Sequence, residues 1–221
     1  MELNADFTAR VVVRDAENAW RPSPMRGVER KMLDRIGDEV ARATTVVRFA
    51  PNAEFHAHTH DGGEEFLVLD GVFEDEHGAF PAGSYIRNPP TSHHAPSAPE
   101  GTTILVKLHQ FDPADRTHVR IATQKSAPVA TADRAGVSVL PLFVDGREDV
   151  RLETWTPGAE VRLEGHDGLE IFVLSGGFAE GGDTLGPWDW LRLPPGQALA
   201  ATAGAEGAKL WVKTGHLAAM V

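Results

Sequence analysis

The sequence predicts an all-β protein made of two similar halves, and three observations lead to this. Short runs rich in β-branched and aromatic residues recur along the chain: ARATTVVRF (41–49), EEFLVLDGVF (64–73), TTILVKL (102–108), VRLETW (150–155), LEIFVLSGGF (169–178) and KLWVKT (209–214). The 22 Gly and 15 Pro residues lie between these runs as turn signals. Many short strands punctuated in this way are typical of a β-sandwich or barrel. The third observation is an internal repeat.

The repeat aligns residues 53–71, AEFHAHTHDGGEEFLVLDG, with residues 159–177, AEVRLEGHDGLEIFVLSGG, without a gap at an offset of 106 residues. Further on, Pro89-Pro90 matches Pro194-Pro195 at an offset of 105, and Val106-Lys107 matches Val212-Lys213 at 106 again. A repeat of about half the chain indicates a domain duplication and not a solenoid.

The boundary between the halves is expected in ATQKSAPVATADRAG (122–136), a small, polar and Pro-containing stretch that reads as a linker. The first domain is then residues 1–122 and the second residues 123–221. Residues 1–27 include WRPSPMRG, which cannot be helical around its prolines. They are expected to form an extended arm with one strand, which covers either the other domain or another subunit.

Composition and charge exclude several classes of function. A formal net charge of −11 repels phosphate backbones, so we expect no nucleic-acid partner. Because the chain has no cysteine, its ten His residues with Asp and Glu are the strong metal ligands that remain, and disulfides, thiolate nucleophiles and iron–sulfur clusters are excluded. No run approaches the roughly 20 apolar residues of a membrane span, and the start MELNADF has no signal-peptide pattern. A cytoplasmic protein without a membrane partner is expected.

Three histidines and one glutamate form a candidate metal site. His58 and His60 occupy alternate positions, and alternate side chains of a strand point to the same face, so both imidazoles can converge on one ion. A turn signal, DGG, separates them from Glu64, which opens an apolar run and can return towards them. A PP pair forces a rigid bend, after which His94 can enter the same interior from another strand.

This ligand set predicts one divalent transition metal ion per chain. Three imidazoles and one carboxylate leave open positions on an octahedral ion and suit Fe(II), Mn, Ni, Co or Zn better than Ca or Mg. Open positions are what a metal catalyst needs, because substrate or O2 must reach the ion.

The residues resemble the two motifs of the cupin superfamily, H-x-H-x3-E-x6-G and G-x5-P-x-G-x2-H. The first motif is complete in His58, His60, Glu64 and Gly71. The second runs through Gly83, Pro89, Thr91 and His94, with Thr91 where glycine is usual. The stretches HTHDGGEEFLVLDGVF and RNPPTSHHAP are most similar to the ChrR-like cupins, named for the cupin half of an anti-sigma factor. The resemblance implies two tandem double-stranded β-helix (jelly-roll) barrels, with the metal inside the first.

Other polar residues near the motifs leave alternatives open. The motif spacing selects His94 as the fourth ligand, so the adjacent His93 points elsewhere, either as a surface residue or as an active-site group. His56 shares the parity of the H-x-H pair and is either a satisfied interior histidine or a group that orients ligands or carries protons. Tyr85 and Arg87 also share a parity, so both line the pocket or both lie on the outer face of the sheet.

The second half is expected to have lost the full metal site. Across the gapless repeat, the four ligand positions become Glu164, His166, Glu170 and Leu199. A leucine in the fourth position removes a ligand and makes that wall apolar. The half is then a structural partner, or it has an apolar ligand pocket without a metal.

The resemblance implies an oxidoreductase of dioxygenase type that acts on a small oxygen-rich or carbonyl substrate, with Glu64 as a possible base; isomerase and decarboxylase chemistry fit the same ligands. The alternative is a non-enzymatic metal or ligand sensor related to ChrR-type anti-sigma factors. Those factors grip their sigma factor with a separate Cys-containing helical domain, so without cysteine we expect no direct sigma-factor binding here. A homodimer is a further option, because cupins commonly form dimers.

Overall fold

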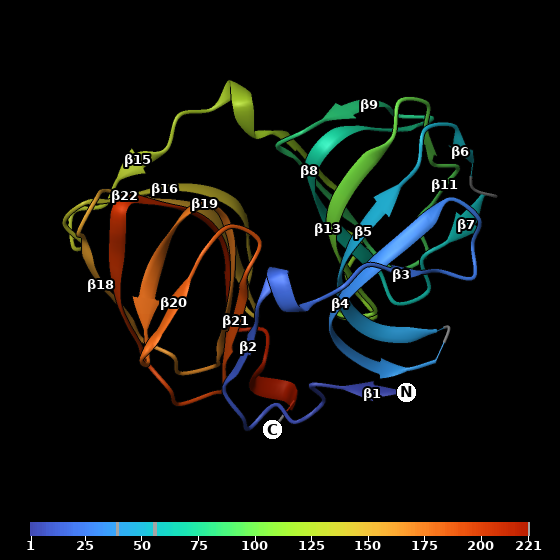
Figure 1. Cartoon of the computed structure of the whole chain (residues 1–221). Helices are drawn as coiled ribbons and strands as arrows, with labels where there is room; N and C mark the ends of the chain where they lie inside the picture. Colours follow the sequence, from blue (N-terminus) through green and yellow to red (C-terminus); the bar gives the residue numbers. More distant parts are fainter. Residues whose placement is uncertain (39, 55–56, 221) are drawn as a thin grey trace. The chain divides into compact units, whose positions relative to one another are not determined.

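A computed structural model describes residues 1–38, 40–54 and 57–220. The chain divides into two compact units (Figure 1). Unit 1 comprises Met1–Ala5 and Ala19–Lys125, and unit 2 comprises Asp6–Asn18 and Ser126–Val221. Strands dominate both units and the helical segments are short 3-10 turns, which confirms the all-β prediction. Over the described range, no helix is long and apolar enough to span a membrane.

Unit 1 is organised around a sheet in which the strands follow the order β1-β4-β5-β13-β8-β10-β14, and a separate pair joins β7 to β11. Its elements are β1 (Glu2–Leu3), β3 (Arg21–Pro22), β4 (Val28–Gly37), β5 (Ala41–Phe49), β6 (Ala53–Glu54), β7 (His58–Thr59), β8 (Glu64–Asp75), β9 (Gly78–Pro81), β10 (Ser84–Asn88), β11 (His93–His94), β12 (Ser97–Ala98), β13 (Thr102–Leu108), β14 (Val119–Ala122) and the 3-10 turn η2 (Thr123–Lys125).

Unit 2 repeats this connectivity, with the order β15-β16-β17-β22-β19-β21-β2. The series β16-β17-β22-β19-β21 corresponds to β4-β5-β13-β8-β10 of unit 1. Its elements are β2 (Val11–Val13), η1 (Asp15–Glu17), β15 (Val129–Ala130), β16 (Val137–Val144), β17 (Asp149–Trp155), β18 (Glu160–Leu163), β19 (Leu169–Glu180), β20 (Asp183–Leu185), β21 (Trp190–Leu193), β22 (Leu199–Thr214) and η3 (Ala218–Met220).

Each unit has its own hydrophobic core on the inner face of its strands. In the first part of β8 of unit 1, before a bulge, Phe66 and Val68 belong to the core, so the even-numbered side chains face inward there. In the first part of β19 of unit 2, Leu169, Ile171 and Val173 belong to the core, so the odd-numbered side chains face inward there. Burial of these apolar side chains away from water is the main stabilising contribution in each unit.

These opposite parities show that the repeat is offset by 105 residues in this region and not by 106. Gly63 and Gly168 each have a left-handed φ, of 77° and 76°, directly before β8 and β19. Gly71 and Gly176 also correspond, because in each a Cβ would meet the carbonyl oxygen of a neighbouring strand, at 2.3 and 2.1 Å. The gapless alignment is therefore wrong by one residue here. Because side chains alternate along a strand, a shift of one residue exchanges the inner and outer faces.

The N-terminal arm crosses from one unit to the other along the sequence. Residues 6–18 pack within unit 2, whereas the sequence assigned all of residues 1–27 to the first domain. Strand β2 pairs antiparallel with β21, with Val11 opposite Arg192 and Val13 opposite Trp190, and Figure 1 shows the blue β2 beside the orange β21. The arm also holds more than the single strand that was expected, because β1 and β3 pair with β4 of unit 1.

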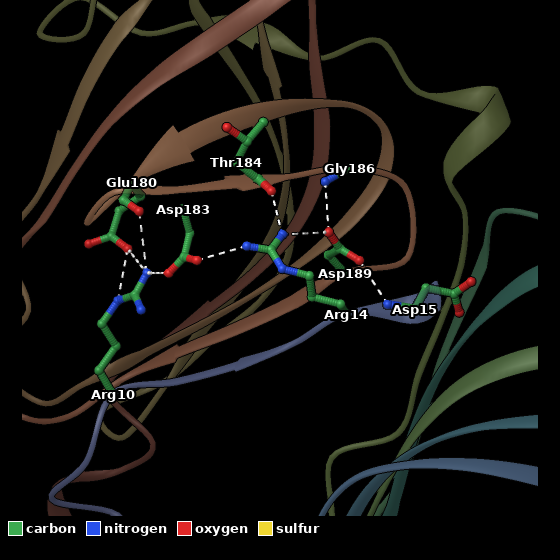
Figure 2. Close-up of polar contacts among 8 residues, drawn as sticks. All are labelled: Arg10, Arg14, Asp15, Glu180, Asp183, Thr184, Gly186 and Asp189. Atoms are coloured by element: carbon green, nitrogen blue, oxygen red, sulfur yellow. Dashed lines mark hydrogen bonds and ion pairs between the residues drawn. The ribbon is translucent and has the colours of Figure 1, made fainter. Parts of the chain in front are cut away.

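Two arginines fix the arm to unit 2 (Figure 2). Arg10 donates through Nη2 to Glu180 at 2.7 Å and lies 2.8 Å from Asp183. Arg14 donates to the other carboxylate oxygen of Asp183 at 2.7 Å. The Glu180 side chain is only 5% exposed, so Arg10 supplies the positive charge that compensates a buried carboxylate.

Candidate metal site

The four motif residues converge at one place in unit 1, on three separate stretches of chain. His58 and His94 lie directly opposite one another in the β7–β11 pair. His60 follows β7, and its carbonyl oxygen accepts a hydrogen bond from the backbone N–H of Thr91 at 3.0 Å. Glu64 is the first residue of β8 and points to the same inner face as Phe66. We call His58, His60, Glu64 and His94 the candidate metal site.

Ligand atoms of all four side chains lie within 4.8 Å of one another. The three imidazole rings approach in pairs, with centroids 4.6 to 4.9 Å apart. A Glu64 carboxylate oxygen lies 3.3 Å from His60 Nε2 and 3.6 Å from His94 Nε2. Because Glu64, His60 and His94 are buried and His58 is exposed, the site has one side open to solvent.

The buried nitrogens of this cluster fit a metal ion. His60 Nε2 and His94 Nε2 are both buried and make no hydrogen bond with any residue that the structure describes. Buried polar atoms without a partner are rare and call for an explanation such as an ion. Three imidazole nitrogens with one carboxylate form a donor set that suits a divalent transition metal.

Hydrogen bonds from neighbouring residues orient three of the ligands. His94 Nδ1 lies 3.2 Å from the buried Asp75 carboxylate, and His60 Nδ1 lies 3.0 Å from Ser92 Oγ. Asn88 donates through Nδ2 to Glu64 at 3.2 Å. An N–H at Nδ1 of His94, held by the carboxylate, leaves Nε2 with a free electron pair, as metal-ligating histidines require.

The electrostatics of the cluster favour charged side chains in the metal-free protein. Burial by itself would raise the pKa of Glu64, but the close approach and charge of His60, together with the charge of His94 and the hydrogen bond from Asn88, lower it overall. Burial would lower the pKa of His94, yet the hydrogen bond to Asp75 and the charge of Glu64 raise it. The Glu64 carboxylate is therefore ionised at neutral pH, and a proton at His94 competes with a metal.

The loop before β11 holds its shape through Thr91, the position where the motif usually has glycine. Thr91 has a φ of 74°, in the left-handed region that β-branched residues rarely adopt. Its counterpart in unit 2 is Gly196, with a φ of 85°. The strained threonine is held by its hydrogen bond to the His60 carbonyl, so strain is stored directly beside the candidate metal site.

The other predicted residues lie elsewhere. Tyr85 and Arg87 are on the opposite face of β10 from Ile86, a core residue, so of the two alternatives the structure has both on the outer face. There Tyr85 donates to Glu65 at 2.8 Å and Arg87 pairs with Asp115 at 2.5 Å. His93 is exposed and lines a surface pocket of about 440 Å³ with His77 and His118. His56 lies outside the described residues.

In unit 2, the 105-residue offset changes which residues correspond to the ligands. Leu163 lies opposite Leu199 in the β18–β22 pair, as His58 lies opposite His94 in unit 1. Gly165 accepts from Gly196 N–H as His60 does from Thr91, and Leu169 opens β19 as Glu64 opens β8. The counterparts are therefore three leucines and a glycine. The prediction that Glu164, His166 and Glu170 correspond to ligands was therefore wrong. Glu164 and His166 are exposed, and Glu170 pairs with His216 at 2.9 Å.

Sequence reasoning missed three residues that contact the ligands, Asp75, Asn88 and Ser92, and one further residue of the inner face of unit 1, Arg30. Asn88 and Ser92 flank the PPT turn and were within reach of a closer reading of the second motif. Asp75 could not be found from local sequence, because it is the last residue of β8 and reaches His94 only if the strand continues that far. Arg30 of β4 lies opposite the core residue Val47 and thus on the inner face, and its buried Nε makes no hydrogen bond.

Comparison with known proteins agrees with this architecture. Residues 8–112 match the model of the ChrR cupin-like domain family. A candidate dioxygenase from Nostoc punctiforme has a similar structure, with a TM-score of 0.77 at 13% identity over 96% of this chain and 84% of that one. A bacterial pirin in complex with nickel(II) from Escherichia coli has a TM-score of 0.69 at 13% identity, over 94% and 99%.

A Bacillus subtilis oxalate decarboxylase mutant has a TM-score of 0.60 at 13% identity, over 92% of this chain and 76% of that one. At such identities the likeness shows the fold alone. No curated protein sequence is a significant match.

Proposed function

We propose that the chain is a member of the cupin superfamily, that unit 1 binds one divalent transition metal at the candidate metal site, and that it catalyses an oxidoreductase reaction of dioxygenase type on a small oxygen-rich substrate. The observation that carries the proposal is the pair of buried Nε2 atoms of His60 and His94, which have no hydrogen-bond partner among the described residues and lie beside the Glu64 carboxylate. Such an arrangement is unfavourable for the protein alone and favourable around a cation.

The residues of the chain would prepare the site for this chemistry. Asp75 and Ser92 would fix the ring orientations of His94 and His60, and Asn88 would fix the Glu64 carboxylate. A bound divalent metal with open positions supplies Lewis-acid polarisation and a place for O2. Since the pKa of Glu64 is lowered, its carboxylate is available as a ligand, and as a base it would be weak.

Two features of the inner face support an oxygen-rich, anionic substrate. Arg30 would offer guanidinium donors to a carboxylate or enolate oxygen inside the barrel, where charge-assisted hydrogen bonds are strong. Apolar side chains of the core, including Phe73, whose ring centroid lies 5.7 Å from that of His94, would exclude water from the reacting atoms. The structural likeness to a candidate dioxygenase and to a nickel-bound pirin agrees with metal-dependent chemistry on small molecules.

Elemental analysis of protein purified without added metal tests the proposal. About one transition metal ion per chain is expected, and His58→Ala combined with His60→Ala should remove it while circular dichroism stays that of a folded β protein. The core of each unit, and not the metal, is expected to supply most of the stability of a chain this long.

The matched control is Glu164→Ala combined with His166→Ala, which should leave the metal content unchanged because both residues are exposed in unit 2. Near two ions per chain would mean that unit 2 also binds metal. Metal content near zero in the native chain would end the proposal. With metal bound, oxygen consumption should follow the addition of small carboxylates more than that of neutral carbonyl analogues; no turnover with either class would favour a sensor over an enzyme.

A further inference from the structure

A charged residue occupies the interior of unit 2 at a position that is apolar in unit 1. Val47 of β5 belongs to the core of unit 1 and lies two residues before Phe49. Glu153 of β17 lies two residues before Trp155, which belongs to the core of unit 2. The Glu153 side chain is 0% exposed. A carboxylate buried on an inner face is unfavourable unless partners compensate it.

The partners of Glu153 are two arginines and an indole. Arg134 Nη1 donates to both carboxylate oxygens at 2.9 Å, and Arg151 Nε donates at 2.7 Å. Trp155 Nε1 donates at 2.7 Å. Arg151 also pairs with Asp149 at 3.1 Å, so two carboxylates balance the charges of the two arginines, and both arginines keep further N–H groups.

This cluster forms part of the wall of a cavity of about 760 Å³. Arg134, Arg151 and Arg162 line it, and so does Leu163, the counterpart of His58. The cavity therefore lies on the side of unit 2 that corresponds to the candidate metal site of unit 1. Its volume lies within the range of about 300–1,000 Å³ that is usual for small-molecule pockets.

The cavity presents unused donors. Arg134 uses only Nη1, and Arg151 uses Nε and Nη1, the latter on Thr214 and Asp149. The Arg162 side chain makes no hydrogen bond or ion pair with any residue that the structure describes. A carboxylate is the natural partner of such spare guanidinium N–H groups.

The cavity also presents unused acceptors. Asp133, Glu160 and Glu164 line it, and within the described part of the chain their side chains have no hydrogen-bond or ion-pair partner. Glu160 and Arg162 share a face of β18, since they are two residues apart, so opposite charges lie side by side along one wall. A simple anion would meet repulsion from these carboxylates, and a simple cation would meet the arginines.

We infer that unit 2 has a metal-independent binding site for a small zwitterion that carries a carboxylate and an ammonium group, such as an amino acid. The arginines bind the carboxylate, and the rim carboxylates bind the ammonium group. Unit 2 has lost the metal ligands at the corresponding positions and carries a polar recognition site on that side of the barrel.

Isothermal titration calorimetry on the full chain tests this inference. The chain carries His58→Ala and His60→Ala, so that the probes cannot bind through a metal. The probes are ω-amino carboxylates from β-alanine to ε-aminocaproate, each compared with the plain carboxylate and the plain amine of the same length. The amino carboxylate of best length is expected to bind about tenfold tighter than either analogue.

Arg162→Gln, at an exposed position, should weaken that binding about tenfold, while Lys209→Gln, also exposed in unit 2 but away from the cavity, should leave it unchanged. The inference is overturned if no member of the series binds, if plain carboxylates bind as tightly as amino carboxylates, or if the two variants behave alike. Because two of the four metal ligands are replaced in every sample, failure here leaves the proposed function of unit 1 untouched.

Discussion

Individual side chains behind the candidate metal site decide how firmly its ligands are held. Asp75 is buried and lies 3.2 Å from His94 Nδ1, so it fixes both the tautomer and the orientation of that ring. Burial would raise the pKa of Asp75, but the hydrogen bond from His94 lowers it, which keeps the carboxylate ionised. A ligand oriented in advance loses less entropy when the metal binds.

Replacing Asp75 by Asn should lower metal affinity about 10–100-fold, because the histidine loses the charged partner that holds its tautomer. Competition with a chelator of known affinity measures the change. Asp70→Asn, at an exposed position of the same strand, is the matched control and should bind metal like the native chain. Equal affinities in the two variants would mean that Asp75 has no part in holding the ligand.

The Arg87–Asp115 pair on the outer face of β10 makes stability depend on pH. Burial would raise the pKa of Asp115, but the hydrogen bond and charge of Arg87 lower it overall. A carboxyl with a lowered folded pKa stabilises the protein above its unfolded pKa of about 3.9, and this contribution is lost as pH falls through the folded value.

Asp115→Asn should therefore lower the free energy of unfolding by about 1–3 kcal/mol at pH 7, and the difference from the native chain should shrink as the pH falls below about 4. Urea unfolding at a series of pH values measures this. A difference that stays constant down to acid pH would show that the loss comes from packing and not from the charge of Asp115.

The sequence predicted those residue-level features that depend on neighbours a few positions away, and it missed those that depend on distant residues. His58, His60, Glu64 and His94 were predicted from spacing, since strand alternation and turns operate over a few residues. The register of the second half was predicted wrongly, although the offset of 105 at Pro194-Pro195 contained the signal. The identical residues HDG in the two halves favoured the offset of 106 instead. However, the alternation of side chains along a strand decides which residues face inward, and residue identity does not.

Among the secondary-structure elements, the long strands were predicted well and the arm was not. TTILVKL corresponds to β13 (Thr102–Leu108) residue for residue, and ARATTVVRF corresponds to β5 (Ala41–Phe49). Strand β2 is three residues long, and its partner β21 lies far along the chain, so no local pattern could place it. Its position is determined by tertiary pairing with an edge strand and by the ion pairs of Arg10 and Arg14 (Figure 2).

Arg10→Gln should destabilise unit 2 by about 1–3 kcal/mol, because it leaves the buried Glu180 carboxylate without its charged partner. Arg10 is partly exposed, so the loss should be smaller than for a fully buried ion pair. Urea unfolding followed by tryptophan fluorescence measures it. Arg21→Gln, an exposed arginine in β3 of unit 1, should have little effect. If both variants unfold alike, the arm is not fixed by this ion pair.

For the molecule as a whole, a bound metal should stabilise unit 1 and leave the stability of unit 2 unchanged. Four of the five tryptophans, Trp155, Trp188, Trp190 and Trp211, belong to unit 2, so fluorescence reports mainly on that unit. The candidate metal site belongs to unit 1. Metal that binds only the folded state raises its stability by about 2.7 kcal/mol at a free concentration 100 times the Kd.

Adding a chelator should therefore lower the unfolding temperature of one calorimetric transition and leave the fluorescence-detected transition of unit 2 unchanged. Calorimetry and fluorescence on the same samples, with and without chelator, give the comparison. A fluorescence midpoint that shifts together with the calorimetric one would mean that the two units unfold as a single cooperative system.

The pairing of Val11 with Arg192 has a consequence for protein synthesis. At about 5–20 residues per second, a ribosome needs roughly 10–40 s after making β2 before it has made β21. During that interval the run Val11-Val12-Val13 is an orphan strand with high β-propensity, able to pair with other nascent chains. Arg10 and Arg14 flank it on both sides, and flanking charges oppose such aggregation. Before β21 is synthesised, the two arginines that later bind Glu180 and Asp183 therefore oppose aggregation of the nascent chain.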